Sequence, residues 1–289
     1  MDGIVVRRLT RPEEFLEAVE VQRSAWGMED YREAAPAHLL RALSDNGGLV
    51  LGAFSGGRMV GVSYGWPVWP SGYFYSHATG VSRGSKYRGV GLALKAEQRR
   101  IVLEEMGMVL AKWTFDPLQA LNSRFNLAKL GAVSRTYLVD YYGEIRDSIN
   151  RGLGTDRVKA EWHLSSQRVL LRLRGKIASD EAALTRLQAL GARPVVRARG
   201  DPPRPELDLG GSLPGVVLVA VPRDVSGLAR RFPGLAGEWR RATREAYSSL
   251  IGDGYILVDS VRAGAVSFNV LWRASMDAVL EGLEPWRSP

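Results

Sequence analysis

Apolar and polar residues alternate along residues 1–165 in a way that predicts short strands separated by amphipathic helices. The expected strands are Ile4–Arg8, Leu49–Phe54, Met59–Tyr64, Gly72–Val81, Met108–Phe115, Ala132–Asp140 and Arg157–Ser165. The first expected helix starts after Thr10. The other expected helices are Pro36–Leu43, Leu92–Met106, Leu118–Leu130 and a short Glu144–Asn150. In the strongest helical pattern, Leu94 and Ile101 face inward and Glu97–Arg100 outward.

The order of these elements predicts the connections between them. The Gly-rich turn before Met59 joins two strands as an antiparallel hairpin. The strand–helix–strand unit from Gly72 to Phe115 predicts a parallel crossover. A mixed sheet with helices on both faces, an α/β fold, is therefore expected.

Residues 166–289 have a different pattern and predict a second, smaller α+β domain. The boundary is expected at 165/166, so that 1–165 forms the first domain. Eight of the nineteen residues in Arg197–Gly215 are Gly or Pro, which predicts a linker or long loop. The remaining expected elements are a basic strand Arg168–Arg174, helices Asp180–Leu190 and Trp239–Leu250, and a strand Val216–Val221. The segments Tyr255–Val261 and Ala265–Arg273 are expected to pair with each other.

Composition narrows the classes of function. The 289 residues are 45% hydrophobic and 24% charged, which is ordinary for a globular protein. No cysteine is present, so disulfides, thiolate metal sites and cysteine nucleophiles are excluded, and with three histidines no metal site is expected. No apolar run has the length of a membrane span, and the first residues do not resemble a signal peptide. A cytoplasmic protein is expected.

The net charge of +8 raises the question of a polyanionic partner. The basic residues, mostly arginine, are spread over both parts of the chain without a basic tail. Nucleic acid is therefore an unlikely partner, although a basic, RNA-associated protein that uses the C-terminal part remains an alternative.

The segment from Ser82 to Gly91 lies between a predicted strand and the helix Leu92–Met106. Glycines at 89 and 91 let backbone N–H groups converge at the helix N-terminus, where a pyrophosphate binds favourably. Lys86 and Arg88 add positive charge. The spacing matches neither a Walker loop nor a dinucleotide-binding fingerprint.

This ordering, together with GVSRGSKYRGVGLAL, resembles the GNAT superfamily of acyl-CoA-dependent N-acyltransferases over residues 1–165. The phosphate loop of that superfamily reads [QR]-x-x-G-x-[GA]; Lys86 here replaces its first residue, and Gly89 and Gly91 are in register. The segments WTFDPLQ, NSRFN, KLGA and YYGEIRD make it most similar to a long prokaryotic subgroup. The resemblance implies a sheet that splays between Gly72–Val81 and Met108–Phe115.

The resemblance further implies that acetyl-CoA, or another acyl-CoA, lies in the splay as co-substrate. The backbone N–H of Val81, or of Gly80 or Ser82, would polarise the thioester. The expected acyl-CoA-binding residues are Val81, Ser82, Lys86, Tyr87, Arg88, Gly89, Val90, Gly91, Leu92, Ala93, Asn122 and Phe125. The implied reaction transfers an acyl group to a small-molecule amine acceptor.

Amine acylation needs a base, and His77 is the first candidate because neutral imidazole accepts a proton near pH 7. Strand alternation predicts that His77, Thr79 and Val81 share one face. A histidine on this strand resembles the arylalkylamine acetyltransferases. The alternative is a structural histidine. Nearby Trp66 and Trp69 either line an apolar acceptor pocket or pack in the core.

Asp116 ends a predicted strand at the splay, where it either binds an ammonium substrate or acts as a catalytic base, or else caps the following helix. The tyrosine that serves as acid in the superfamily maps onto Leu127, so it is missing here. Tyr137, Tyr141 and Tyr142 are the candidate replacements, and Asn122, Asn126 or water is the candidate contact to the CoA arm. Without that tyrosine, a non-catalytic acyl-CoA sensor stays open. The C-terminal part is expected to cover the acceptor side or to form a homodimer contact.

Overall fold

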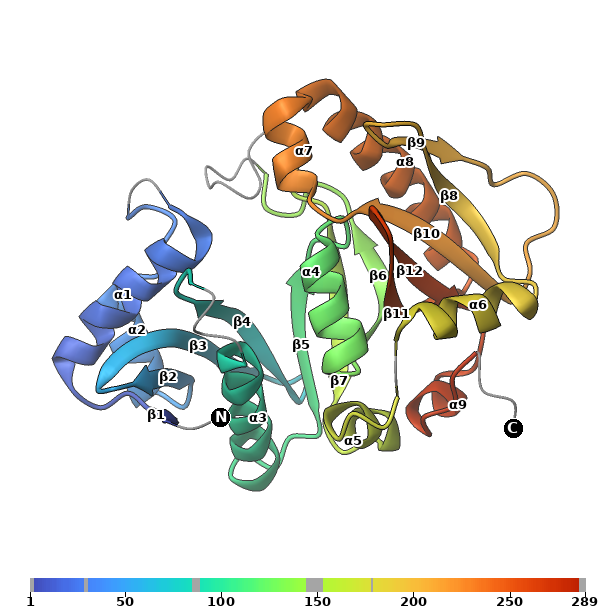
Figure 1. Cartoon of the computed structure of the whole chain (residues 1–289). Helices are drawn as coiled ribbons and strands as arrows, with labels where there is room; N and C mark the ends of the chain where they lie inside the picture. Colours follow the sequence, from blue (N-terminus) through green and yellow to red (C-terminus); the bar gives the residue numbers. More distant parts are fainter. Residues whose placement is uncertain (1–2, 29–30, 85–88, 144–152, 178, 286–289) are drawn as a thin grey trace. The chain divides into compact units, whose positions relative to one another are not determined.

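The computed structural model describes residues 3–28, 31–84, 89–143, 153–177 and 179–285 (Figure 1). Its contacts divide the chain into two compact units. Unit 1 comprises Met1–Trp113 with Ile145–Arg151, and unit 2 comprises Thr114–Glu144 with Gly152–Pro289. The expected short helix Glu144–Asn150 lies outside the described residues.

Unit 1 is built on a sheet with the strand order β1-β2-β3-β4-β5. The first four strands pair antiparallel, and β4 and β5 are parallel. The strands are β1 Ile4–Arg8, β2 Leu49–Ser55, β3 Arg58–Val68, β4 Tyr73–Val81 and β5 Leu110–Phe115, of which β5 continues into unit 2 after Trp113. The helices are α1 Pro12–Trp26, α2 Ala37–Asp45 and α3 Val90–Glu104. The predicted mixed α/β sheet is confirmed.

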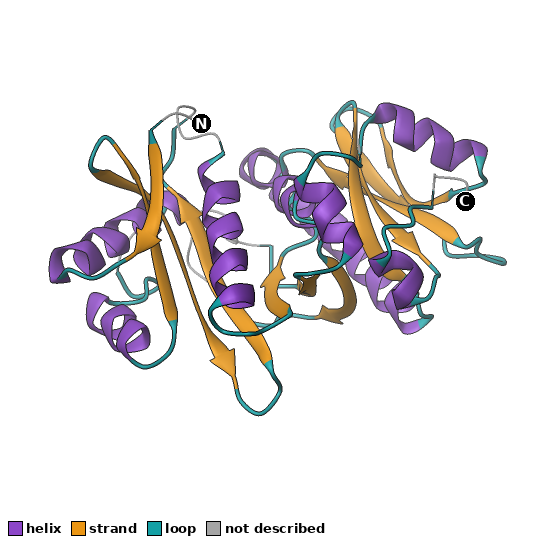
Figure 2. Cartoon of the chain, turned by 90° about the horizontal axis from the view of Figure 1, so that it is seen from below, coloured by secondary structure: helices purple, strands orange, loops and turns teal. Residues whose placement is uncertain are grey.

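The helices of unit 1 cover both faces of the sheet (Figure 2). A Cβ built on Gly80 would meet Ala25 and Trp26 of α1, whereas one on Gly61 would meet the α3 side chains at 2.8–3.0 Å. These close approaches require glycine, and they show that α1 and α3 pack on opposite faces. Phe15, with other apolar side chains of α1, α2 and the strands, forms the core on the α1 face.

A bulge in β4 changes which side chains share a face. Tyr64 pairs with Ala78 and Trp66 pairs with Tyr75, so Gly65 of β3 lies opposite two residues of β4, Ser76 and His77. An extra residue of this kind bends a strand and re-aims the side chains that follow it. β4 is therefore bent just where its pairing with β5 ends.

Unit 2 contains a sheet with the strand order β7-β6-β11-β12-β10-β8-β9. Its strands are β6 Val133–Leu138, β7 Arg157–His163, β8 Arg193–Arg199, β9 Arg204–Leu207, β10 Val216–Pro222, β11 Ile256–Ala263 and β12 Val266–Trp272. Its helices are α4 Ala120–Ser123, which continues as the π-helical η2 Arg124–Lys129, α5 Gln167–Leu173, α6 Glu181–Ala189, α7 Val225–Arg231, α8 Pro233–Gly252 and α9 Met276–Leu280.

Two expectations for this part of the chain are wrong. The predicted basic strand Arg168–Arg174 is the helix α5, capped by the Ser166 hydroxyl, which accepts from Val169 N. Arg197–Gly215 is not a simple loop, because β8 and β9 form an antiparallel hairpin. That hairpin is held to α8 by a 2.9 Å hydrogen bond from Trp239 Nε1 to the Pro203 carbonyl.

The compact units also divide the chain elsewhere than the expected boundary at 165/166. β6 pairs antiparallel with β11 through Ser134↔Leu257, so the strand packs with C-terminal residues. The segment Thr114–Glu144 therefore belongs to unit 2. Within the described ranges, no helix is long and apolar enough to span a membrane.

Candidate functional site

The open edge of β4 is the central feature of unit 1. Among the described residues, β4 and β5 pair only through Phe74↔Ala111 and Tyr75↔Lys112. Beyond Tyr75, β4 continues to Val81 with β3 as its partner. Within the part of the chain that the structure describes, no strand pairs with the other edge of this segment, which is the arrangement that the predicted splay requires.

The hydrogen bonds to β3 decide which N–H groups point to the open edge. Ser82 N donates to the Val60 carbonyl at 2.9 Å. Successive residues of a strand direct their backbone groups to opposite edges, so Ser82 and Gly80 point toward β3 while Val81 and Thr79 point away from it. Of the three predicted thioester donors, Val81 therefore has the suitable direction, and Gly80 and Ser82 do not.

The N-terminus of α3 lies beside the end of β4. Val81 pairs with Gly61, and Gly61 in turn contacts Val90 in the first turn of α3. Gly89 is the N-cap residue with φ 88°, a left-handed conformation that favours glycine. Ala93 N donates to the Gly89 carbonyl at 3.0 Å, so the preceding N–H groups of Val90, Gly91 and Leu92 have no partner within the helix. The predicted Lys86, Tyr87 and Arg88 lie outside the described residues.

His77 stands in a group of aromatic rings on the α1 face. Its ring centroid is 5.5 Å from those of Tyr64 and Trp66 and 6.0 Å from that of Tyr75. The residue is exposed, yet desolvation by these rings lowers the pKa of His77 from its ordinary value of 6.5. A neutral imidazole that reaches solvent is suited to accept a proton.

The prediction that His77 shares a face with Thr79 and Val81 is wrong. Tyr64, against which His77 packs, donates to Gln22 of α1 at 3.1 Å. Thr79 instead contacts Ser63 Oγ at 2.8 Å, and Ser63 accepts from Gln98 of α3. The β4 bulge is the physical reason, because the extra residue reverses the alternation between His77 and Thr79.

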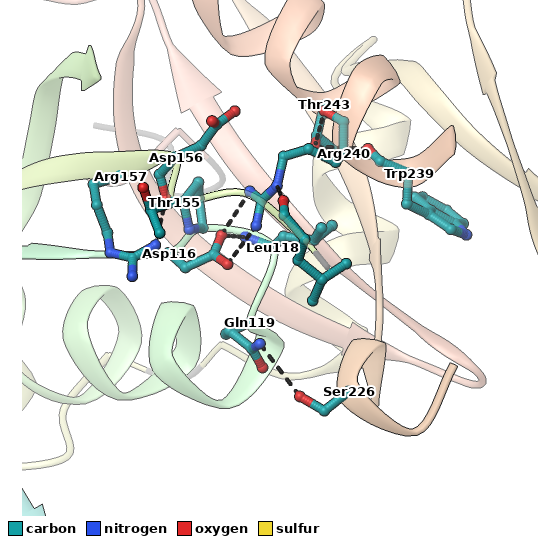
Figure 3. A network of polar contacts seen from close by, with 12 residues as sticks. Asp116, Leu118, Gln119, Thr155, Asp156, Arg157, Ser226, Trp239, Arg240 and Thr243 are labelled. Carbon is teal, nitrogen blue, oxygen red and sulfur yellow. Dashed lines mark hydrogen bonds and ion pairs between the residues drawn. The ribbon is translucent and has the colours of Figure 1, made fainter. Parts of the chain in front are cut away.

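Both carboxylate oxygens of Asp116 accept hydrogen bonds from residues of unit 2 (Figure 3). Arg240 donates to them at 2.9 and 2.6 Å, and Leu118 N donates to Oδ1 at 2.9 Å. Burial lowers the pKa of Arg240, but the charge of Asp116 and the hydrogen bond to it outweigh this, so the pKa is raised. The bond from Leu118 N closes the turn before α4, whose N-cap residue is Gln119, so Asp116 is not the cap of that helix and instead forms a buried ion pair.

The other predicted site residues of unit 2 lie on α4, on η2 and in the turn that contains Tyr141. Asn122 is exposed on α4, and Phe125 is half-buried in η2. Tyr141 is 48% exposed and packs edge-to-face on Tyr142, with ring centroids 4.6 Å apart. Tyr142 has its hydroxyl 2.9 Å from that of Thr114. The exposure of Tyr141 is compatible with a contact to substrate.

Sequence reasoning missed two polar residues on the inner face of α3. Lys95 is 3% exposed and Gln98 is fully buried, although Gln98 was expected to face outward. Gln98 lies four residues after Leu94 and three before Ile101, and Lys95 lies three residues before Gln98, so this spacing was the signal available in the sequence. Among the described residues, no group of three or more His, Cys, Asp or Glu could hold a metal ion.

Comparison with solved structures finds GNAT-family acetyltransferases over about 55% of the chain. A protein from Desulfovibrio desulfuricans assigned to that family is 20% identical with a TM-score of 0.45, covering 56% of this chain and all of its own. The ribosomal-protein-S18-alanine N-acetyltransferase of Escherichia coli is 15% identical with a TM-score of 0.45, over 56% of this chain and 94% of its own.

The PaiA N-acetyltransferase of Thermoplasma acidophilum, solved in complex with coenzyme A, is 18% identical with a TM-score of 0.41. That likeness covers 54% of this chain and 98% of the Thermoplasma chain. These structures belong to the GNAT superfamily, which is the family that the sequence resembles. No protein-family model matches the chain, and no curated protein matches its sequence.

Proposed function

We propose that this protein is an N-acyltransferase that moves an acetyl group from acetyl-CoA to a small-molecule amine. The observation that carries the proposal is the open edge of β4, with the N–H of Val81 directed away from β3 and the N-terminus of α3 immediately beyond it. The strand edge suits a thioester carbonyl, and the helix N-terminus suits a pyrophosphate.

In this mechanism, Val81 N–H donates to the thioester oxygen and stabilises the negative charge that develops there as the amine attacks. His77 is the proposed proton acceptor for the attacking amine, and as the C–N bond forms the C–S bond of the thioester breaks, so that CoA leaves as a thiolate that takes a proton from water. His77 lies on the α1 face of the sheet, whereas Val81 faces α3. The proton therefore reaches His77 through bridging water molecules. The aromatic rings of Trp66 and Tyr75 beside His77 offer faces that bind a cationic or aromatic amine.

CoA should stabilise the folded protein, and Gly89→Glu should abolish that stabilisation. The substitution places a carboxylate at the helix N-terminus, where it competes with the pyrophosphate, and strains a residue with φ 88°. Thermal unfolding with and without CoA measures the effect. A ligand at 100 times its Kd adds about 2.7 kcal/mol to the free energy of unfolding.

Gly107→Glu is the matched control, because Gly107 also has a positive φ of 67° with no atom within 4 Å, and it follows the other end of α3. It carries the same strain and the same charge change without the N-terminal position. CoA should stabilise this variant as it does the wild type. An unchanged CoA response in Gly89→Glu would contradict the placement of the pyrophosphate.

A further inference from the structure

The side chain of Lys95 fills the point at which β4 and β5 part. Tyr75↔Lys112 is the last pair of the two strands, so Ser76 and Trp113 are the first residues beyond it. Lys95 Nζ donates to Ser76 Oγ at 2.7 Å and lies 3.9 Å from the centroid of the Trp113 ring. One residue of α3 thus contacts both strands at the start of the splay.

Polar contacts continue from Lys95 along the bent part of β4. Lys95 Nζ donates to Gln98 Oε1 at 3.0 Å, and Gln98 Nε2 donates to Ser63 Oγ at 3.2 Å. The Ser63 hydroxyl lies 3.2 Å from the Ala78 carbonyl and 2.8 Å from Thr79 Oγ1. The contacts therefore attach β4 to α3 on both sides of the bulge.

Burial of the Lys95 amine where β4 and β5 part costs free energy, because the charged form loses its hydration. Lys95 is 3% exposed, and desolvation lowers its pKa from 10.5 to about 7. The neighbouring inner positions of α3 are filled by apolar residues such as Leu94 and Ile101, which carry no such cost. A buried ionisable group beside a candidate site, held by specific hydrogen bonds, is the pattern of a group with a role at that site.

We infer that Lys95 is a positioning residue for acyl transfer, which holds β4 in its bent course through Ser76 and Gln98 and thereby aims the N–H of Val81 at the thioester carbonyl. The inference rests on the proposed function, since it assumes that acetyl-CoA lies along the open edge of β4. Without the tie at Ser76, the bulged segment is free to shift toward β5, and a displacement of about 1 Å is enough to weaken a hydrogen bond aimed at a reacting atom.

The test measures carbonyl polarisation directly and needs no acceptor amine. Acetyl-CoA labelled with ¹³C at the thioester carbonyl is bound to the purified full chain, and the carbonyl stretching band is recorded by infrared difference spectroscopy. In the wild type, the hydrogen bond from Val81 should move the band to lower frequency than in free acetyl-CoA. In Lys95→Met, most of that shift should be lost while the Kd of CoA stays unchanged, because the backbone N–H groups proposed for the pyrophosphate, in the first turn of α3, are not altered by the substitution.

Companion variants separate positioning from stability. Lys95→Gln keeps an N–H donor for Ser76 and should restore part of the shift, and Ser76→Ala should lose it as Lys95→Met does. Arg100→Met, on the exposed side of α3, should leave the band unchanged. If Lys95→Met does not fold, Lys95→Gln and Ser76→Ala still decide the question.

A full shift in Lys95→Met, or in Ser76→Ala when Lys95→Met does not fold, would overturn the inference while leaving the proposed function intact. A wild-type protein that does not bind CoA would overturn the proposed function, and the inference with it. These two failures are distinguished by the wild-type measurement alone.

Discussion

His77→Ala should lower kcat for the amine acceptor by about 10²–10⁴-fold, the usual contribution of a positioned general base. The KM for acetyl-CoA should change little, because the proposed pyrophosphate site at the start of α3 is untouched. The measurement uses an acceptor found with a panel of amines. His38→Ala is the matched control, since His38 is an exposed histidine of the same unit, on α2.

The pH dependence of this reaction follows from the direction of the His77 shift. Desolvation lowers its pKa below 6.5, so the neutral, proton-accepting form predominates above that pH. Activity should therefore rise with pH along a limb whose midpoint lies below 6.5, and that limb should disappear in His77→Ala. Activity that survives His77→Ala within a few-fold would make the histidine a packing residue and Tyr141 the better candidate.

Arg240→Met should destabilise the protein by about 3–5 kcal/mol, the cost of leaving one member of a buried ion pair without the other. Arg240 is 5% exposed, and besides Asp116 it binds the Leu153 carbonyl at 2.7 Å, so three hydrogen bonds are lost together. Methionine preserves much of the side-chain volume. Urea unfolding of the full chain measures the change.

Arg241→Met provides the comparison, because its exposed side chain on the same helix should change stability little. Adding Asp116→Asn to Arg240→Met should recover part of the loss, since the buried negative charge is then removed as well. If Arg240→Met and Arg241→Met unfold at the same urea concentration, the ion pair contributes nothing to stability.

Local patterns in the sequence predicted much of unit 1. The helix expected at Leu92–Met106 is α3 Val90–Glu104, and the expected antiparallel hairpin is β2 and β3. These elements are encoded by residues close together in the chain, through glycine turns and apolar periodicity. The α3 N-terminus could be located for the same reason.

The bulge in β4 could not be predicted, because it depends on how β3 and β4 are paired rather than on the composition of either strand. That single extra residue moved His77 to the other face from Val81. The strand expected at Arg168–Arg174 failed for a related reason. Arg168 and Arg172 are buried on one face of α5, where both bind Glu284, more than 100 residues away in the chain. Arginine at such positions looks like a solvent-facing residue until its partner is known.

The pairing of β6 with β11 has a consequence for how the protein can be dissected. A fragment that stops at 165 would retain Asp116 without Arg240, so the carboxylate would lose its ion-pair partner. It would also retain β6 without β11, so the edge of β6 that pairs through Ser134↔Leu257 would be unpaired. Such a fragment is expected to aggregate instead of yielding a minimal enzyme. The C-terminal residues are thus no detachable accessory, because structural elements within 114–165 depend on them for a strand partner and for a buried counter-charge.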